Sequence, residues 1–219
     1  MITARSYAFD GPHFRGRPRE RTIQAMSDAP PTPSPAERRA ELLGQRGCVL
    51  WFTGLSGAGK TTLALALELA LLDAGRLSFV LDADVVRTGL CADLGYDAAS
   101  RSENVRRLGE LAKVLADAGT IVLVASIAPF AADRARLRER IGAERFLEVH
   151  VATSLELCQA RDVKGLYARA ASGELQGMTG IDSPYEAPSS PDLAIDTATT
   201  EIPAALALLV EAGARVWAR

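Results

Sequence analysis

Residues 54–61 read Gly54-Leu55-Ser56-Gly57-Ala58-Gly59-Lys60-Thr61, and they follow directly on the apolar run 48–53. Residues 62–69 after them are typical of a helix. A strand, a glycine-rich loop and a helix start in this order form a phosphate-binding loop, because the glycines let backbone N–H groups and the helix dipole face a phosphate. In that motif Lys60 reaches the β- and γ-phosphate oxygens and the Thr61 hydroxyl ligates Mg²⁺. The stretch predicts a nucleoside triphosphate site, and its alternative is a glycine-rich turn without a ligand.

Strand-like and helix-like segments alternate through the rest of the chain. This pattern predicts an α/β P-loop NTPase fold, with a parallel five-stranded sheet flanked by helices. The expected strands are 48–53, 77–81, 120–125, 146–151 and 192–196. The expected helices are 36–44, 60–74, 102–118, 131–141, 154–161 and 201–217, with Gly75 and Gly119 as helix stops. Because ligands bind at the carboxyl ends of parallel strands, the site is expected just after residues 53, 81 and 125.

The length of 219 residues suits one α/β domain. We expect residues 1–35, rich in arginine and proline, to be a disordered tail, and residues 36–219 to form the domain. The run 30–35 within that tail is expected to be a stiff, non-helical linker, and Met26 is an alternative start. The tail arginines could contact an anionic partner, although a solvated tail is the simpler interpretation.

Bulk composition excludes several classes of function. A net charge of −2 does not indicate a nucleic-acid or membrane-surface binder. No apolar stretch reaches the ~18 residues of a membrane span. Cys48, Cys91 and Cys158 show no paired spacing, which favours buried thiols in a reducing cytoplasm over a zinc site or a disulfide framework. Only two histidines, His13 and His150, are available for histidine-based catalysis.

Two carboxylates, Asp82 and Asp84, follow the second expected strand, with Arg87 close behind. An unpartnered buried carboxylate is costly, so this pair needs a metal, a hydroxyl or an arginine. In phosphoryl transfer, one carboxylate can orient the metal's water shell while another serves the attacking hydroxyl. The alternative for either residue alone is a helix cap or a surface charge.

Two later stretches carry further candidate binding residues. Tyr96 offers a flat face for a base, and Arg101 with Asn104 on one helical turn offers donors for phosphate or sulfate oxygens. Residues 161–182 form a polar, glycine-punctuated segment that could close as a mobile lid over the site. The alternatives are a solvated, salt-bridged helix start for the first stretch and a surface helix with a turn for the second.

These segments, in this order, resemble the adenylylsulfate kinase family over roughly residues 36–200. The resemblance rests on the phosphate loop and on residues 81–87, Gly89-Leu90, 93–96, Arg101 with 103–107, 164–167, 179–182 and 184–188. It implies an ATP-dependent kinase of sulfate assimilation that transfers the γ-phosphoryl of MgATP to the 3′-hydroxyl of adenosine 5′-phosphosulfate (APS), giving 3′-phosphoadenylylsulfate (PAPS). It also implies a cytoplasmic homodimer with ATP and Mg²⁺ as cofactors, and no nucleic-acid or membrane partner.

The resemblance assigns roles to individual residues. Lys60, Asp82 and Asp84 would be catalytic, with Asp84 at the 3′-hydroxyl, and with Asp82 and Thr61 at the metal. ATP would contact Gly54, Leu55, Ser56, Gly57, Ala58, Gly59, Lys60, Thr61, Thr62 and Arg161. The acceptor would contact Arg87, Tyr96, Arg101, Asn104, the Ile127 backbone, Lys164 in the lid and Met178.

The chain departs from the family pattern at several positions. Ala83 and Val85 replace a glycine and an asparagine of the Asp-Gly-Asp-Asn segment. Ser126 and Ala128 replace an aromatic residue and a serine, and Ala128 cannot accept a phosphate. Met178 replaces the aromatic residue that would face Tyr96 across the adenine, and it packs a base less rigidly. Two alternatives therefore stay open: a kinase for another nucleotide or hydroxyl-bearing acceptor, and a regulatory module that binds nucleotide without turnover.

Overall fold

The computed structural model describes residues 33–218, and residues Pro33–Arg219 group into one compact unit. The expectations for the tail before residue 33, including Met26, lie outside the described residues. Within residues 33–218, no helix combines the length and the apolar character needed to cross a membrane.

Five parallel strands form one sheet in the order β2-β3-β1-β4-β5, as the alternating sequence pattern predicted. The strands are β1 Cys48–Thr53, β2 Ser78–Asp82, β3 Ile121–Ala125, β4 Phe146–Val151 and β5 Leu193–Ile195. Ala125 pairs with both Phe52 and Asp82 in the sheet register, so β1, β2 and β3 end at the same level. The three loops that follow these strands therefore start from one edge of the sheet.

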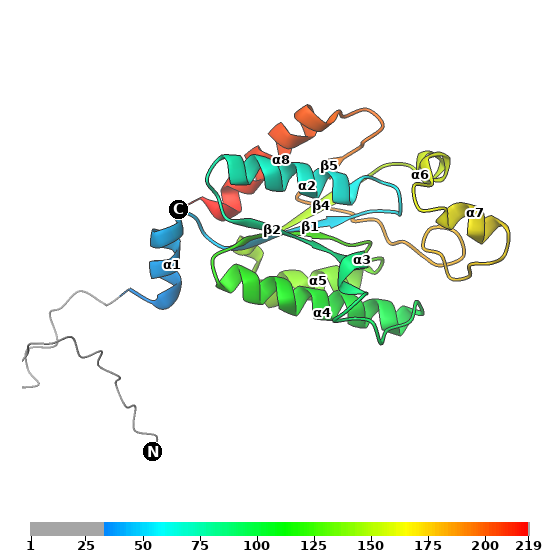
Figure 1. Cartoon of the computed structure of the whole chain (residues 1–219), viewed down its shortest axis with the longest axis horizontal. Helices are drawn as coiled ribbons and strands as arrows, with labels where there is room; N and C mark the ends of the chain where they lie inside the picture. The colour runs from blue at the N-terminus through cyan, green and yellow to red at the C-terminus, as the bar shows by residue number, and fades with distance from the viewer. Residues whose placement is uncertain (1–32, 219) are drawn as a thin grey trace, which may run out of the picture. The chain divides into compact units, whose positions relative to one another are not determined.

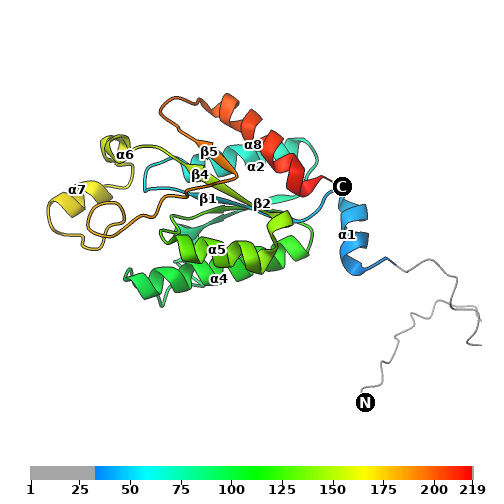
Figure 2. The same ribbon diagram turned by 180° about the vertical axis from the view of Figure 1, so that it is seen from behind.

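Helices cover both faces of the sheet (Figure 1). On one face lie α2 (Lys60–Asp73) and α8 (Ile202–Trp217), and on the other lie α4 (Ala98–Asp117) and α5 (Ala131–Ile141). The same layers are seen from behind in Figure 2, where α6 (Leu155–Arg161) and α7 (Leu166–Ala171) project beyond the carboxyl ends of the strands. The remaining helices are α1 (Pro35–Leu43), α3 (Ala83–Val86) and the 3₁₀ turn η2 (Ala143–Arg145).

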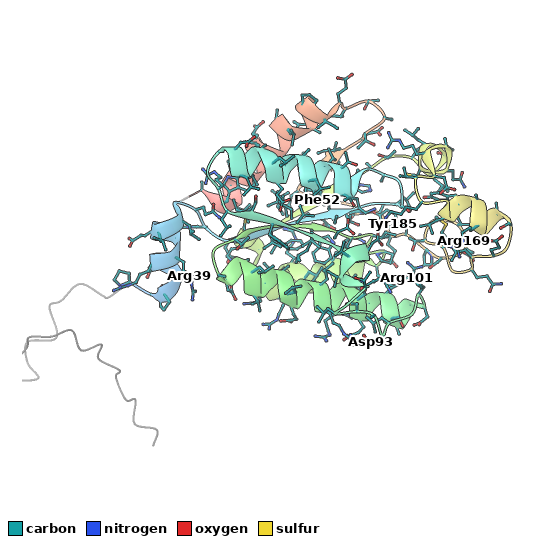
Figure 3. The ribbon with its side chains drawn as sticks, in the orientation of Figure 1. Arg39, Phe52, Asp93, Arg101, Arg169 and Tyr185 are labelled. Atoms are coloured by element: carbon teal, nitrogen blue, oxygen red, sulfur yellow. The ribbon has the colours of Figure 1, made fainter. Side chains whose placement is uncertain are left out.

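The central strands are buried on both faces, as parallel strands between two helical layers must be. Every residue of β1 and β3 is buried. Phe52, labelled in Figure 3, packs with Leu67 of α2 in one apolar cluster, while Trp51 packs with Leu108 of α4 in the other. This two-sided burial gives the loops at the strand ends a rigid support.

Several element boundaries differ from the sequence prediction, and each difference has a local cause. The helix α1 begins at Pro35, inside the stretch we expected to be non-helical, because Ser34 caps it and proline suits the first helical turn. The helix α4 begins at residue 98 rather than 102 because the Asp97 side chain accepts from the Ser100 backbone N–H. The short helices α3 and α7 were not among the expected helices, since four and six residues show no periodicity to detect, but a helix cap at the aspartates and a surface helix within residues 161–182 were the stated alternatives.

Candidate functional site

The phosphate loop connects β1 to α2 through glycines in the left-handed region. Gly57 and Gly59 have φ of 78° and 107°, conformations that a side chain disfavours. Lys60 begins α2, and its Nζ donates to the Leu55 carbonyl at 2.7 Å, which closes the loop on itself. Of the predicted loop residues, Gly54, Leu55 and Ala58 shape the backbone but do not line the main cavity, whereas Ser56, Gly57 and residues 59–62 do.

Two threonine hydroxyls hold the outer side of this loop. Thr153 Oγ1 and Thr197 Oγ1 each donate to the Ala58 carbonyl at 3.0 Å, and the two hydroxyls lie 2.7 Å apart. Because the Ala58 carbonyl is bound from outside, the neighbouring N–H groups are held in a fixed arrangement. Sequence reasoning missed both threonines, since they follow β4 and β5 and carry no local motif.

The Lys60 ammonium is the principal cation of the loop. Burial lowers its pKa from 10.5 to about 8, and the nearby Lys164 charge lowers it in the same direction, while Asp84 and Asp82 oppose this shift. A lysine in this state gains from an anion placed beside it, because the anion restores the preference for the charged form. The Lys60 side chain therefore favours binding of a phosphate anion in the loop.

Asp82 ends β2 and faces the start of α2. Its Oδ2 accepts from Thr61 Oγ1 at 2.7 Å, and its Oδ1 accepts from the Asp84 backbone N–H at 2.8 Å. The second bond makes Asp82 the cap of α3, so the capping alternative from the sequence is correct as well. The cap fixes the carboxylate beside the Thr61 hydroxyl, and these two oxygen groups form a candidate Mg²⁺ site.

Asp84 lies in the first turn of α3 and is exposed to the cavity. Its carboxylate forms an ion pair with Lys164, from the segment between α6 and α7. Both side chains are more than half exposed, so the pair lies at the cavity surface and a ligand can reach it.

One cavity of about 1150 Å³ brings most predicted site residues together. It extends from the phosphate loop to α4 and to the segment 175–179. The predicted residues that line it are Ser56, Gly57, Gly59, Lys60, Thr61, Thr62, Asp82, Asp84, Arg87, Tyr96, Arg101, Asn104, Ile127, Arg161, Lys164 and Met178. Cys158 is buried outside this lining, and neither His150 nor any cysteine belongs to it.

Arg87, Tyr96 and Arg101 form one unit at the rim. The Arg87 guanidinium lies 4.4 Å from the centre of the exposed Tyr96 ring, and it donates to the Gly95 carbonyl at 3.0 Å. Arg101 Nε donates to the Tyr96 carbonyl at 2.7 Å. The two arginines fix the loop that presents the tyrosine, so one face of that ring is occupied by a cation rather than left bare.

Arg101, labelled in Figure 3, also links α4 to the loop after α7. Its Nη1 donates to Thr179 Oγ1 at 2.7 Å and its Nη2 to the Gly177 carbonyl at 2.6 Å. The two bonds flank Met178, which is almost fully buried and lines the cavity between them. Arg101 therefore acts on the Met178 loop as well as on the cavity itself.

Asn104 and Ile127 supply the floor of this end of the cavity. Asn104 is buried, and its Oδ1 has no hydrogen-bond partner among the residues that the structure describes. A buried polar atom without a partner is costly, and a ligand donor would satisfy it. The Ile127 carbonyl accepts from Thr53 Oγ1 at 2.6 Å, and Thr53 also lies 3.1 Å from the Tyr185 hydroxyl.

The expected lid segment contacts the phosphate loop at two points. Arg161 Nη1 donates to Thr197 Oγ1 at 2.8 Å and to the Gly57 carbonyl at 3.4 Å, and the Tyr167 hydroxyl donates to the Ser56 carbonyl at 3.0 Å. The segment is therefore held over the loop in this conformation. Its mobility stays a prediction.

The fold, the phosphate loop and the paired carboxylates at the β2 end together define a kinase of the P-loop class. The sequence model of the family "Adenylylsulphate kinase" matches residues 46–196. The chain therefore belongs to the adenylylsulfate kinase family, and it is an ATP-dependent kinase.

Individual relatives agree with this assignment. The adenylyl-sulfate kinase of Enterobacter sp. (strain 638) is 54% identical over 166 residues, which cover 76% of this chain and 83% of that protein. The adenylyl-sulfate kinase of Aeromonas salmonicida is 55% identical over 157 residues, or 72% of this chain and 80% of that protein. Among solved structures, the Mycobacterium tuberculosis APS kinase CysC in complex with AMPPNP and APS superimposes with a TM-score of 0.73 at 45% identity, covering 76% of this chain and 97% of that one.

Proposed function

We propose that the chain transfers the γ-phosphoryl group of ATP to the 3′-hydroxyl of APS and so produces PAPS for sulfate assimilation. The observation that carries this proposal is that the Lys60 ammonium, the Thr61–Asp82 oxygen pair and the Asp84 carboxylate all face one cavity. Phosphoryl transfer depends chiefly on positioning and on charge stabilisation, and these groups supply both.

The triphosphate occupies the end formed by the phosphate loop. Lys60 exchanges its bond with the Leu55 carbonyl for the β- and γ-phosphate oxygens, and the loop N–H groups surround the β-phosphate. Arg161 contacts the nucleotide beside Thr197, at the outer end of the loop. These contacts supply positive charge where negative charge develops in the transition state.

Thr61 and Asp82 fit a magnesium ion. A hydroxyl and a carboxylate, 2.7 Å apart, are hard oxygen ligands of the kind that Mg²⁺ takes together with phosphate oxygens and water. Within residues 33–218, no group of three or more His, Cys, Asp or Glu side chains could hold a metal alone, which agrees with a metal shared between protein and triphosphate. When bound, Mg²⁺ neutralises phosphate charge and orients the transferred group.

Asp84 receives the proton of the attacking hydroxyl. This role requires the carboxylate to exchange its ion pair with Lys164 for the acceptor's 3′-hydroxyl. Lys164 is then available to the charge that develops on the transferred group. No covalent enzyme intermediate is needed, because the donor and acceptor ends belong to the same cavity.

The acceptor occupies the opposite end. Arg87 contacts the phosphosulfate, since a guanidinium suits its oxygens, and Asn104 lies at the same end, where its unsatisfied Oδ1 can accept from a hydroxyl or N–H donor of the acceptor. Tyr96 and Met178 enclose the adenine, Arg101 supports both through its backbone contacts, and the Ile127 backbone completes the wall. A second candidate function is phosphorylation of another nucleotide, favoured by the apolar side chains of Ala128 and Met178 in the cavity lining.

A panel of acceptors tests the proposal. The purified chain with MgATP is expected to release ADP with APS and not with its 3′-deoxy analogue, and ³¹P NMR of the product should show a new 3′-phosphomonoester. Faster turnover on another nucleotide would overturn the choice of acceptor. Binding of ATP without ADP release on any acceptor would instead favour a non-catalytic module.

A matched pair of lysine variants tests the donor site. Lys60→Ala is expected to lower the rate by about 10²–10³-fold, as for loss of a preorganised charge contact. Lys113→Ala removes a lysine that pairs with Asp117 on α4, away from the cavity lining, and should leave the rate unchanged. Similar rates in both variants would contradict the role of Lys60.

The chain works in the cytoplasm as a homodimer. The three free cysteines Cys48, Cys91 and Cys158 are all buried, which suits a reducing compartment. An APS kinase of Thiobacillus denitrificans, 34% identical with a TM-score of 0.57, is described as hexameric, and this chain covers 29% of that longer one. Sedimentation equilibrium on the full chain would measure the assembly, and a monomer or a hexamer at micromolar concentration would overturn the dimer.

A further inference from the structure

A buried arginine on α5 lies behind the acceptor end of the cavity and was assigned no role by the sequence. Arg134 is 4% exposed, and its Nε donates to Glu148 Oε1 on β4 at 2.7 Å. Its other two nitrogens point away from this ion pair, toward two loops. Nη1 donates to the Ala128 carbonyl at 2.7 Å and Nη2 to the Glu186 carbonyl at 2.6 Å.

The first of these loops, residues 126–129, forms part of the cavity lining and is called here the acceptor wall. Ala128 within it has φ of 43°, in the left-handed region that alanine rarely adopts. A strained residue keeps such a conformation only when its surroundings impose it. The bond from Arg134 to the Ala128 carbonyl is a contact of this kind, and it lies beside the Ile127 backbone that we assign to the acceptor.

The second loop, residues 184–187, is called here the strap. Its Glu186 backbone N–H donates to the Pro129 carbonyl at 2.8 Å, and the Glu186 carboxylate accepts from the Ala131 backbone N–H at 2.6 Å, at the start of α5. Tyr185, labelled in Figure 3, lies 3.1 Å from the Thr53 hydroxyl, which in turn donates to the acceptor wall. The strap and the wall are thus fixed to each other, with Arg134 bonded to both.

We infer that Arg134 is a positioning residue, which sets the acceptor wall and the strap in the geometry that binds the phosphoryl acceptor. The inference rests on the proposed function for the identity of that acceptor. Arg134 is not among the residues that line the cavity, and its hydrogen bonds go to the acceptor wall, the strap and Glu148 rather than to the phosphate loop. Its planar guanidinium explains the choice of residue, because a fork of donors can bond two carbonyls and a carboxylate at once.

The test replaces the Arg134 guanidinium with a group that keeps the positive charge but has a different geometry. Arg134→Lys retains an ammonium for Glu148 but cannot reach both carbonyls, so KM for the acceptor is expected to rise at least tenfold, while Kd for an ATP analogue changes less than twofold. Arg136→Lys is the control, because Arg136 is on the same helix with its side chain 75% exposed and paired with Asp133. Should Arg134→Lys fail to fold, Arg134→Gln is measured in its place.

Two further readouts distinguish positioning from general stability. Hydrogen exchange in Arg134→Lys should accelerate in the acceptor wall and the strap but not in residues 54–61, a result that does not depend on which acceptor is correct. Adding Ala128→Gly should recover part of the lost acceptor affinity, since glycine adopts positive φ without strain. Uniformly accelerated exchange, or equal losses of ATP and acceptor affinity, would overturn the inference. If APS itself is not phosphorylated, KM is measured with whichever acceptor releases ADP.

Discussion

The pKa of Lys60 gives a quantitative prediction for nucleotide binding. In the ligand-free protein this pKa is about 8, with burial as the main cause. The ammonium is therefore about nine-tenths charged at pH 7 and about one-tenth charged at pH 9. Bound phosphates favour the charged form, so the complex holds the lysine proton over this whole range. At pH 9 most Lys60 side chains in the free protein are uncharged, so each must take up a proton when the nucleotide binds. The apparent affinity for the nucleotide therefore falls as the pH rises.

The expected change is about tenfold in Kd for a non-hydrolysable ATP analogue between pH 7 and pH 9, equal to ~1.4 kcal/mol. Isothermal titration calorimetry in two buffers of different ionisation enthalpy measures both the affinity and the proton uptake. Uptake should be close to zero at pH 7 and should approach one proton per site at pH 9.

The control is Lys60→Arg, because a guanidinium stays charged throughout this range. Its affinity for the analogue should be independent of pH, whatever its absolute value. A wild-type Kd that does not change with pH would refute the reasoning. The same pH dependence in Lys60→Arg would also refute it, since another group would then be the one that titrates.

Two further substitutions test other parts of the site. Met178→Phe should tighten APS binding by ~0.5–1.5 kcal/mol, because an aromatic ring would then face Tyr96 across the adenine. Equilibrium binding of APS measures this change. Unchanged or weaker affinity would contradict the proposed stacking of the adenine. Thr153→Val keeps the side-chain shape but removes a hydroxyl that donates to the Ala58 carbonyl, so the free energy of unfolding should fall by ~1 kcal/mol, together with the affinity for the ATP analogue. Denaturant unfolding and calorimetry check the second case, and wild-type values in both measurements would show that Thr197 alone holds the loop.

The parts of the fold that could be predicted are those that local pattern determines. The strand β3 and all of β1 except Thr53 are continuous apolar runs. Gly75 and Gly119 end helices with φ of 70° and 103°, so composition and periodicity were sufficient for these elements. The common edge where the phosphate loop and Asp82 meet also followed from the sequence, because parallel strands bring their carboxyl ends together.

The supporting residues could not be predicted, because their partners are far away in the sequence. Thr153 and Thr197 meet the Ala58 carbonyl from 95 and 139 positions away. Arg134 bonds the Glu186 carbonyl across 52 positions. Each of these side chains is an ordinary polar residue in its own segment, and only the packing of β4, β5 and α5 gives it a role.

The ion pair between Asp84 and Lys164 has a consequence for ATP hydrolysis in the absence of the acceptor. Without an acceptor, the carboxylate that would draw a proton from an attacking oxygen is already engaged by a cation 80 positions away. In the proposed mechanism, a water molecule that enters the nucleotide-loaded site finds this carboxylate paired with Lys164, whereas an acceptor with its own anionic groups can compete for the lysine. We therefore expect ATP hydrolysis to stay slow until the acceptor binds.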